Sequence, residues 1–212
     1  MLKIIDKNRL YFGLYFVSFF LVFLEDFNKP VLQATFYFSN HRSAFGDAFF
    51  AFWTHLGEAS PYFLAAIFFY FYKKDKQNTL KIGIGALAVL IVTSILKQVF
   101  DFPRPSNFME DWHLLASYHT VLGVDLNEGG TSFPSGHTSS AFTLWSLVAF
   151  QFKNKMPQIS LFLTAFLVAL SRVYLGQHFP QDVLFGSAIG VAIALCVEYY
   201  FSKKQVATTP IV

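Results

Sequence analysis

Long apolar runs, repeated along most of the chain, restrict this sequence to a fold that is built within a lipid bilayer. Of the 212 residues, 54% are hydrophobic and only 14% are charged, and 28 are Phe. A soluble domain averages about 25% charged residues, which it needs to cover its surface. The shortage of charge therefore predicts an all-α, polytopic membrane protein.

Six apolar runs predict six transmembrane helices. Several runs are shorter than the ~20 residues that a bare span needs, but flanking Tyr, Trp and Lys can complete them at the membrane interfaces. We expect one membrane-embedded domain over residues 1–204 and a disordered tail over residues 205–212. The runs cover residues 10–24, 59–72, 82–100, 137–152, 159–176 and 183–201.

The positions of Lys and Arg predict the orientation of these helices. Basic residues precede the first run, separate the second from the third and the fourth from the fifth, and follow the sixth. In a six-span topology these segments share one side, which the positive-inside rule makes the cytoplasm. Both termini would be cytoplasmic, and residues 25–58, 101–136 and 172–182 would face outward. We expect a bacterial inner membrane, with the outer face periplasmic.

Residues 31–57 differ from the apolar runs because polar residues interrupt an aromatic stretch. Phe45, Phe49, Phe52 and Trp53 recur at helical spacing, which predicts an amphipathic helix in the outer interface. Packing and gating of a lipid substrate are both compatible with this pattern.

Charge and cysteine content argue against nucleic-acid binding and against a cysteine-based metal site. The net charge of +3 is small, and the basic residues form no stripe with exposed aromatics, so nucleic acid is not an expected partner. Cys196 is the only cysteine, which excludes an intrachain disulfide and a cysteine-based metal site. The sequence leaves the oligomeric state open.

Three cations fall near the expected outer ends of helices. Lys97 and Arg104 flank the end of the third run, and Arg172 lies near the end of the fifth. Taken singly, Lys97 and Arg172 could be snorkelling side chains. Brought together at one membrane face, two guanidinium groups and an ammonium would match a phosphate dianion, because Arg binds its oxygens through a planar fork.

The fourth run begins with the segment SFPSGHTSSAF, residues 132–142. A helix that starts at Ser135 presents free backbone N–H groups, a hydroxyl, a glycine that lets a ligand come close, and the His137 imidazole. Helix N-termini of this kind bind anions. A Ser N-cap with an incidental His is the alternative.

His178 and Asp182 are one helical turn apart, with Pro180 at a position that suits the first turn of a helix. Asp182 can hold one imidazole nitrogen and leave the other free to attack. Asp182 could equally cap the helix, where the dipole favours a carboxylate, and both roles can hold at once.

Three motifs together resemble a known family. Residues 97–105 read K-x6-R-P, residues 134–137 read P-S-G-H, and residues 171–182 read S-R-x5-H-x3-D. In this order they are similar to the signature of the type 2 phosphatidic acid phosphatases, the membrane branch of the superfamily that includes vanadium haloperoxidases. The resemblance implies dephosphorylation of a lipid phosphate or diphosphate through a phosphohistidine intermediate, with no metal and no other cofactor.

The resemblance also implies a role for each matching residue. His178 would be the nucleophile, Asp182 its orienting partner, and His137 the acid that protonates the leaving oxygen. The remaining motif residues would hold the phosphate of a membrane lipid. They are Lys97, Arg104, Ser135, Gly136, Ser171 and Arg172.

The substrate and some alternatives stay open. Undecaprenyl diphosphate, phosphatidylglycerol phosphate, phosphatidic acid and the phosphates of lipid A all fit such a site. The loop 106–131, with Asp111, His113, His119 and Glu128, is expected to cover it as a lid. Six apolar runs argue against a soluble haloperoxidase, and the presence of both histidines argues against a transporter or binding protein with an inactive pocket. A proton-relay protein would carry acidic residues at mid-helix, and the acidic residues of this sequence are not expected there, which argues against this class.

Overall fold

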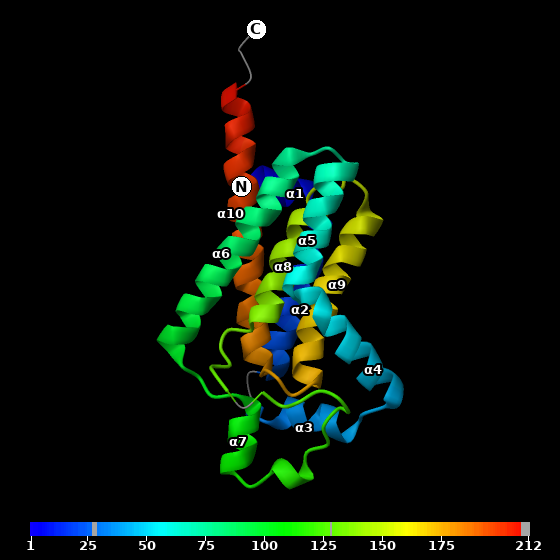
Figure 1. The fold of residues 1–212 in the computed structure, drawn as a ribbon, viewed down its shortest axis with the longest axis vertical. Helices are drawn as coiled ribbons and strands as arrows, with labels where there is room; N and C mark the ends of the chain where they lie inside the picture. The colour runs from blue at the N-terminus through cyan, green and yellow to red at the C-terminus, as the bar shows by residue number, and fades with distance from the viewer. Residues whose placement is uncertain (27–28, 128, 209–212) are drawn as a thin grey trace.

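The structure, a computed structural model, describes residues 1–26, 29–127 and 129–208 (Figure 1). Every regular element in this part of the chain is a helix, as the sequence predicts. The end of the expected tail, residues 209–212, lies outside the described residues, while the last helix continues to Thr208. The elements are α1 Leu2–Lys7, α2 Arg9–Asp26, α3 Gln33–Asn40, α4 Ala44–Trp53, η1 Thr54–Gly57, α5 Ala59–Ile67, η2 Phe68–Tyr72, α6 Lys76–Phe100, α7 Pro105–Asp111, η3 Leu115–Ser117, α8 Gly136–Ala149, α9 Lys155–Tyr174 and α10 Pro180–Thr208.

Three helical stretches of the described residues are long and apolar enough to cross a membrane. They are Lys76–Asp111, Lys155–Tyr174 and Pro180–Lys204, and the apolar stretch Ala59–Tyr72 is shorter. α8 has 14 residues, so it rises about 21 Å, less than the ~30 Å of a bilayer core. Membrane-spanning length is therefore found for three helices, and the count of six stays a prediction.

The short helix α8 lies at the centre of the bundle, packed against α6, α9 and α10. Its contact with α10 is close because α10 presents glycine there. A Cβ built at Gly190 would lie 2.5 Å from the Ser139 carbonyl oxygen, and one at Gly186 would lie 2.8 Å from that of Ser135. Any larger residue would push the helices apart, so these glycines bring the N-terminus of α8 against the start of α10.

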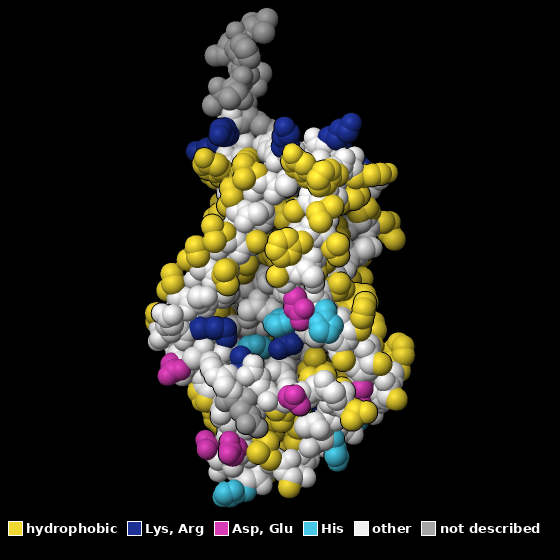
Figure 2. Space-filling view, in the orientation of Figure 1, with side chains coloured by type: hydrophobic (Ala, Val, Ile, Leu, Met, Phe, Trp, Pro, Cys, Tyr) yellow, Lys and Arg dark blue, Asp and Glu magenta, His cyan; other side chains and the backbone are white. Residues whose placement is uncertain are grey.

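The two ends of the bundle differ in character. Both termini lie at one end, and α3 and α7 lie at the other (Figure 1). Lys and Arg side chains gather at the end with the termini, hydrophobic side chains cover the middle, and acidic and His side chains lie toward the opposite end (Figure 2). Two basic residues between the second and third apolar runs, Lys76 and Lys81, belong to α6, and Lys81 forms an ion pair with Glu198 of α10 at 2.8 Å.

Residues 31–57 contain the α-helices α3 and α4 and the short 3-10 helix η1. α4 starts at its N-cap Ser43, whose hydroxyl accepts a hydrogen bond from the Gly46 amide. Phe45 and Phe52 are exposed, whereas Trp53 stacks on Phe49 and donates from its indole to the Thr164 carbonyl of α9. The segment is thus anchored to the bundle through Trp53, and its position in a membrane interface stays a prediction.

Candidate active site

The three sequence motifs meet at the end of the bundle opposite the termini. Lys97 lies in the last turn of α6, Arg104 is the N-cap of α7, and Arg172 lies in the last turn of α9. His137 is in the first turn of α8, and Asp182 is in the first turn of α10. Figure 2 shows basic and His side chains gathered around a hollow in the surface, with an acidic side chain beside them.

Hydrogen bonds join the three motifs directly. The first motif meets the third where Arg104 Nη1 donates to the Gln177 carbonyl at 3.0 Å. The second meets the third where the Ser135 amide donates to the Asp182 carbonyl at 3.1 Å. Lys97 Nζ donates to the Thr131 carbonyl at 2.5 Å, just before the second motif. These bonds assemble motifs that lie up to about 80 residues apart into one site.

The centre of the site is a buried histidine and carboxylate pair. His178 Nδ1 lies 3.4 Å from Asp182 Oδ2, and the two side chains are 3% and 0% exposed. Asp182 Oδ2 also accepts from the Phe179 amide at 2.9 Å and from the Ser132 hydroxyl. Since an ionised carboxylate can only accept, His178 carries its proton on Nδ1, and Nε2 is left with its lone pair.

Burial sets the charge state of His178. Loss of solvent lowers the pKa of the imidazole to about 4, although the hydrogen bond to Asp182 acts in the opposite direction. Arg172 and Arg104 add smaller contributions that also favour the neutral ring. A histidine in this setting is neutral throughout the physiological range, which is the state that a nucleophile requires.

The N-terminus of α8 is open toward the site. Ser135 caps the helix, with its hydroxyl accepting from the Thr138 amide at 3.4 Å, so the helix begins at Gly136, one residue after the expected start at Ser135. A Cβ built at Gly136 would meet nothing within 4 Å. Free space therefore lies over the first turn, where backbone N–H groups and the helix dipole attract anions.

The cations are held by neutral oxygen atoms. Besides the bonds given above, Arg104 Nε donates to the Gly129 carbonyl at 3.1 Å. Arg172 Nη1 donates to the Thr54 hydroxyl of η1 at 2.6 Å, and Arg172 Nε is a buried donor with no partner among the described residues. A carbonyl or hydroxyl fixes the direction of a cation without neutralising its charge, so the site keeps its attraction for an anion.

His137 lies beside a second histidine and carboxylate pair. Its Nε2 is 3.7 Å from Glu58 Oε1, and the same oxygen faces His55 Nδ1 at 2.8 Å. His137 is also within electrostatic range of Arg104, Arg172 and His178. Each of the two motif histidines thus has a carboxylate beside it.

Other predicted residues lie farther from this arrangement. The Ser171 hydroxyl is buried and donates to the Val168 carbonyl of its own helix at 2.6 Å. Asp111, His113 and His119 of the expected lid are exposed, and Glu128 lies outside the described residues. The loop does contact the site through its backbone, since it supplies the carbonyl groups that Lys97 and Arg104 use.

Sequence reasoning missed four residues of the site: Ser132, Thr54, His55 and Glu58. Ser132 stands three positions before Ser135, and this closeness to the second motif was an available signal. The other three belong to the segment THLGE, residues 54–58. They follow an aromatic helix, and no spacing rule connects them with residues 137 or 172.

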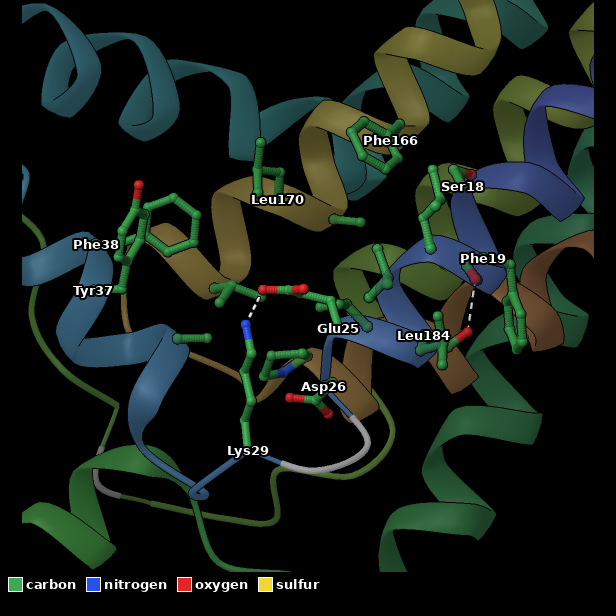
Figure 3. A pocket seen from close by; sticks show the side chains of 18 of the residues that line it. Ser18, Phe19, Glu25, Asp26, Lys29, Tyr37, Phe38, Phe166, Leu170 and Leu184 are labelled. Carbon is green, nitrogen blue, oxygen red and sulfur yellow. Dashed lines mark hydrogen bonds and ion pairs between the residues drawn. The ribbon is translucent and has the colours of Figure 1, made fainter.

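A separate apolar cavity of about 790 Å³ lies between α2, α3, α9 and α10. Its wall includes Phe19, Phe166 and Leu184, and Lys29 and Glu25 form an ion pair at its edge (Figure 3). Val173 and Pro180 of the third motif line it, but none of the predicted catalytic or phosphate-binding residues does. We therefore place the chemistry at the cationic site and not in this cavity.

Comparison with known proteins agrees with the site. The profile of the PAP2 superfamily matches residues 78–205, which is more than half of the chain. The chain therefore belongs to the PAP2 superfamily, and its class is that of a membrane lipid phosphatase, as the three motifs predict. The matched range contains all three motifs and α6 to α10 up to residue 205.

Particular relatives differ in the substrates that their names give. The undecaprenyl-diphosphatase BcrC of Bacillus subtilis is 27% identical over 186 residues, 87% of this chain and 88% of its own. The lipid A 4'-phosphatase of Porphyromonas gingivalis is 33% identical over 149 residues, 67% of this chain and 61% of its own. The crystal structure of Aquifex aeolicus LpxE superposes with a TM-score of 0.68 at 27% identity, covering 82% of this chain and 98% of the other.

Proposed function

We propose that this protein hydrolyses a lipid phosphate or diphosphate through a phosphohistidine intermediate and without a metal ion. The observation that carries the proposal is the buried pair of His178 and Asp182, 3.4 Å apart, beside cations that are held by carbonyl and hydroxyl oxygens. One fixed and one free imidazole nitrogen make an activated nucleophile. The fork of Arg172, with its unpartnered Nε–H, supports a bound phosphate.

The proposed reaction has two steps, and both histidines take part in it. In the first, His178 Nε2 attacks phosphorus, the bond from phosphorus to the leaving oxygen breaks, and His137 gives that oxygen its proton. In the second, water attacks the phosphohistidine, His137 takes a proton from the water, and inorganic phosphate is released. Phosphoryl transfer needs mainly positioning and charge stabilisation, which Lys97, Arg104, Arg172 and the start of α8 would supply.

The set of residues in the site favours a mechanism without metal. A two-metal phosphatase needs several carboxylate or imidazole ligands around the reacting oxygens. Among the residues that the structure describes, no three His, Cys, Asp or Glu side chains are gathered where they could hold a metal ion. Three fixed cations would repel a divalent ion and can neutralise the phosphate themselves.

We place the protein in a bacterial inner membrane, with six spans, cytoplasmic termini and the active site on the periplasmic face. The gathering of Lys and Arg at the end with both termini supports this orientation (Figure 2). The site lies at the opposite end of the bundle (Figure 1). A lipid phosphate would then enter from the outer leaflet.

The test is phosphate release by purified protein in detergent, with millimolar EDTA present. The panel contains undecaprenyl diphosphate, phosphatidylglycerol phosphate, phosphatidic acid and lipid A. We expect release from at least one lipid, and inhibition by vanadate, which adopts the five-coordinate geometry of the transition state. Activity that disappears in EDTA and returns with Mg²⁺ or Zn²⁺ would refute the metal-free mechanism. Lipid binding without any release would favour a transporter or binding protein with a non-catalytic pocket.

A further inference from the structure

The segment 54–58 is fixed against the catalytic helices. The Trp145 indole of α8 donates to the Leu56 carbonyl at 3.1 Å. A Cβ built at Gly57 would lie 2.7 Å from the His137 carbonyl oxygen, so only glycine lets η1 approach the first turn of α8 this closely. Glu58, the next residue, is therefore held beside His137 by packing on both sides.

Glu58 lies on the side of the site where the leaving group would depart. In an in-line displacement the leaving oxygen is opposite the nucleophile, here His178, and next to the acid, here His137. Glu58 Oε1 is 3.7 Å from His137 Nε2. Whatever is attached to the leaving oxygen must therefore pass close to Glu58.

Glu58 presents a carboxylate at this position. His55 Nδ1 approaches its carboxylate at 2.8 Å, and the charge of Arg172 lies within electrostatic range. Its side chain is 42% exposed, and it makes no capping hydrogen bond to α5. The carboxylate is thus available to the substrate and is not needed to hold the helix.

We propose that Glu58, positioned by His55, selects lipid phosphomonoesters with an uncharged leaving group and disfavours lipid diphosphates. This inference rests on the proposed function. A diphosphate would bring the second, anionic phosphate against the Glu58 carboxylate, and like charges repel. The alcohol that leaves from a phosphomonoester brings no such charge.

Glu58 also acts on the orientation of His137. Its Oε1 lies 3.7 Å from His137 Nε2, so the carboxylate can hold the ring where it gives its proton to the leaving oxygen. An alcohol is a more basic leaving group than a phosphate and depends more on this proton. Loss of Glu58 would therefore slow a monoester and favour a diphosphate, so both effects change the preference in the same direction.

The experiment compares farnesyl phosphate with farnesyl diphosphate, which share one lipid chain and differ only in the leaving group. We expect Glu58→Gln to raise the ratio of kcat/KM for diphosphate over monophosphate about tenfold, and Glu58→Lys to raise it further. Glu110→Gln, which removes an exposed carboxylate of α7, is the matched control and should leave the ratio unchanged.

The outcomes separate this inference from the proposed function. If wild-type protein hydrolyses both lipids and Glu58→Gln leaves the ratio unchanged, selection by Glu58 is wrong while the phosphatase assignment stands. A parallel loss for both lipids with an unchanged ratio would likewise overturn it, because a merely structural role predicts that pattern. If neither lipid nor any member of the larger panel releases phosphate, the proposed function itself fails.

Discussion

Replacing Thr54 by Val tests whether η1 holds Arg172 in place for phosphate. Thr54 Oγ1 accepts from Arg172 Nη1 at 2.6 Å, and both residues are buried. Valine keeps the branched shape and removes only the hydroxyl. A hydrogen bond to a charged group contributes about 1.5–3 kcal/mol, and the abandoned donor stays buried. Since 1.4 kcal/mol corresponds to tenfold, we expect kcat/KM to fall about 10- to 100-fold.

The assay measures kcat/KM for a lipid phosphomonoester and the inhibition constant of vanadate in the same detergent. We expect kcat/KM to fall and the inhibition constant of vanadate to rise together, because each depends on the orientation of the guanidinium fork. Thr54→Ser, which restores the hydroxyl, should recover most of the activity. Thr164→Val is the matched control, since that hydroxyl bonds only a carbonyl of its own helix.

The outcome that would refute the reasoning is specific. If Thr54→Val matches wild type in both constants while Arg172→Lys loses vanadate affinity, Arg172 contributes to the site but η1 does not position it. Melting temperatures in detergent separate this result from a general loss of folding.

Further predictions concern the two histidines and the topology. His178→Ala should abolish turnover in a folded protein, and wild-type-like turnover would exclude it as the nucleophile. Because burial lowers the pKa of His178 to about 4, kcat/KM should hold as pH falls toward 4 and drop below it, as the ring takes up a proton. A drop centred above pH 6 would contradict this. His137→Ala should cost roughly 10²- to 10⁴-fold on an alkyl phosphate and less on p-nitrophenyl phosphate, and equal losses would count against His137 as the acid. In a Cys196→Ser background, cysteines replacing Lys76 and Lys155 should resist an impermeant thiol reagent in intact cells, and one replacing Asn127 should react. The reverse pattern would invert the topology.

The motif residues could be predicted because their chemistry does not depend on knowing the fold. An Arg near the end of an apolar run, a His and Asp one turn apart, and a Ser-Gly-His helix start each suggest an anion site or a nucleophile by residue type alone. The structure brings these segments together, and hydrogen bonds such as Arg104 to Gln177 connect them. The role of each residue stays a prediction.

The segment THLGE could not be predicted because its role arises only from tertiary packing. Thr54 reaches Arg172, and Glu58 reaches His137, only because Gly57 lets η1 lie against α8.

The first residue of α6 could not be predicted from hydropathy for another reason. Hydropathy placed the third run at 82–100, but Asp75 caps α6, which starts at Lys76, and Lys81 is neutralised by Glu198 within the bundle.

The distribution of charge in the site has one consistent pattern. Within the described residues, the cations Lys97, Arg104 and Arg172 are held by carbonyl groups or a hydroxyl, whereas the carboxylates of Asp182 and Glu58 face histidines. A carboxylate beside a cation would neutralise the charge that attracts phosphate, but beside a histidine it decides where the proton resides. The proposed mechanism needs this division, because binding depends on uncompensated positive charge and transfer depends on two imidazoles in different protonation states. Moving a carboxylate from its histidine to one of the three cations would therefore impair phosphate binding and phosphoryl transfer together.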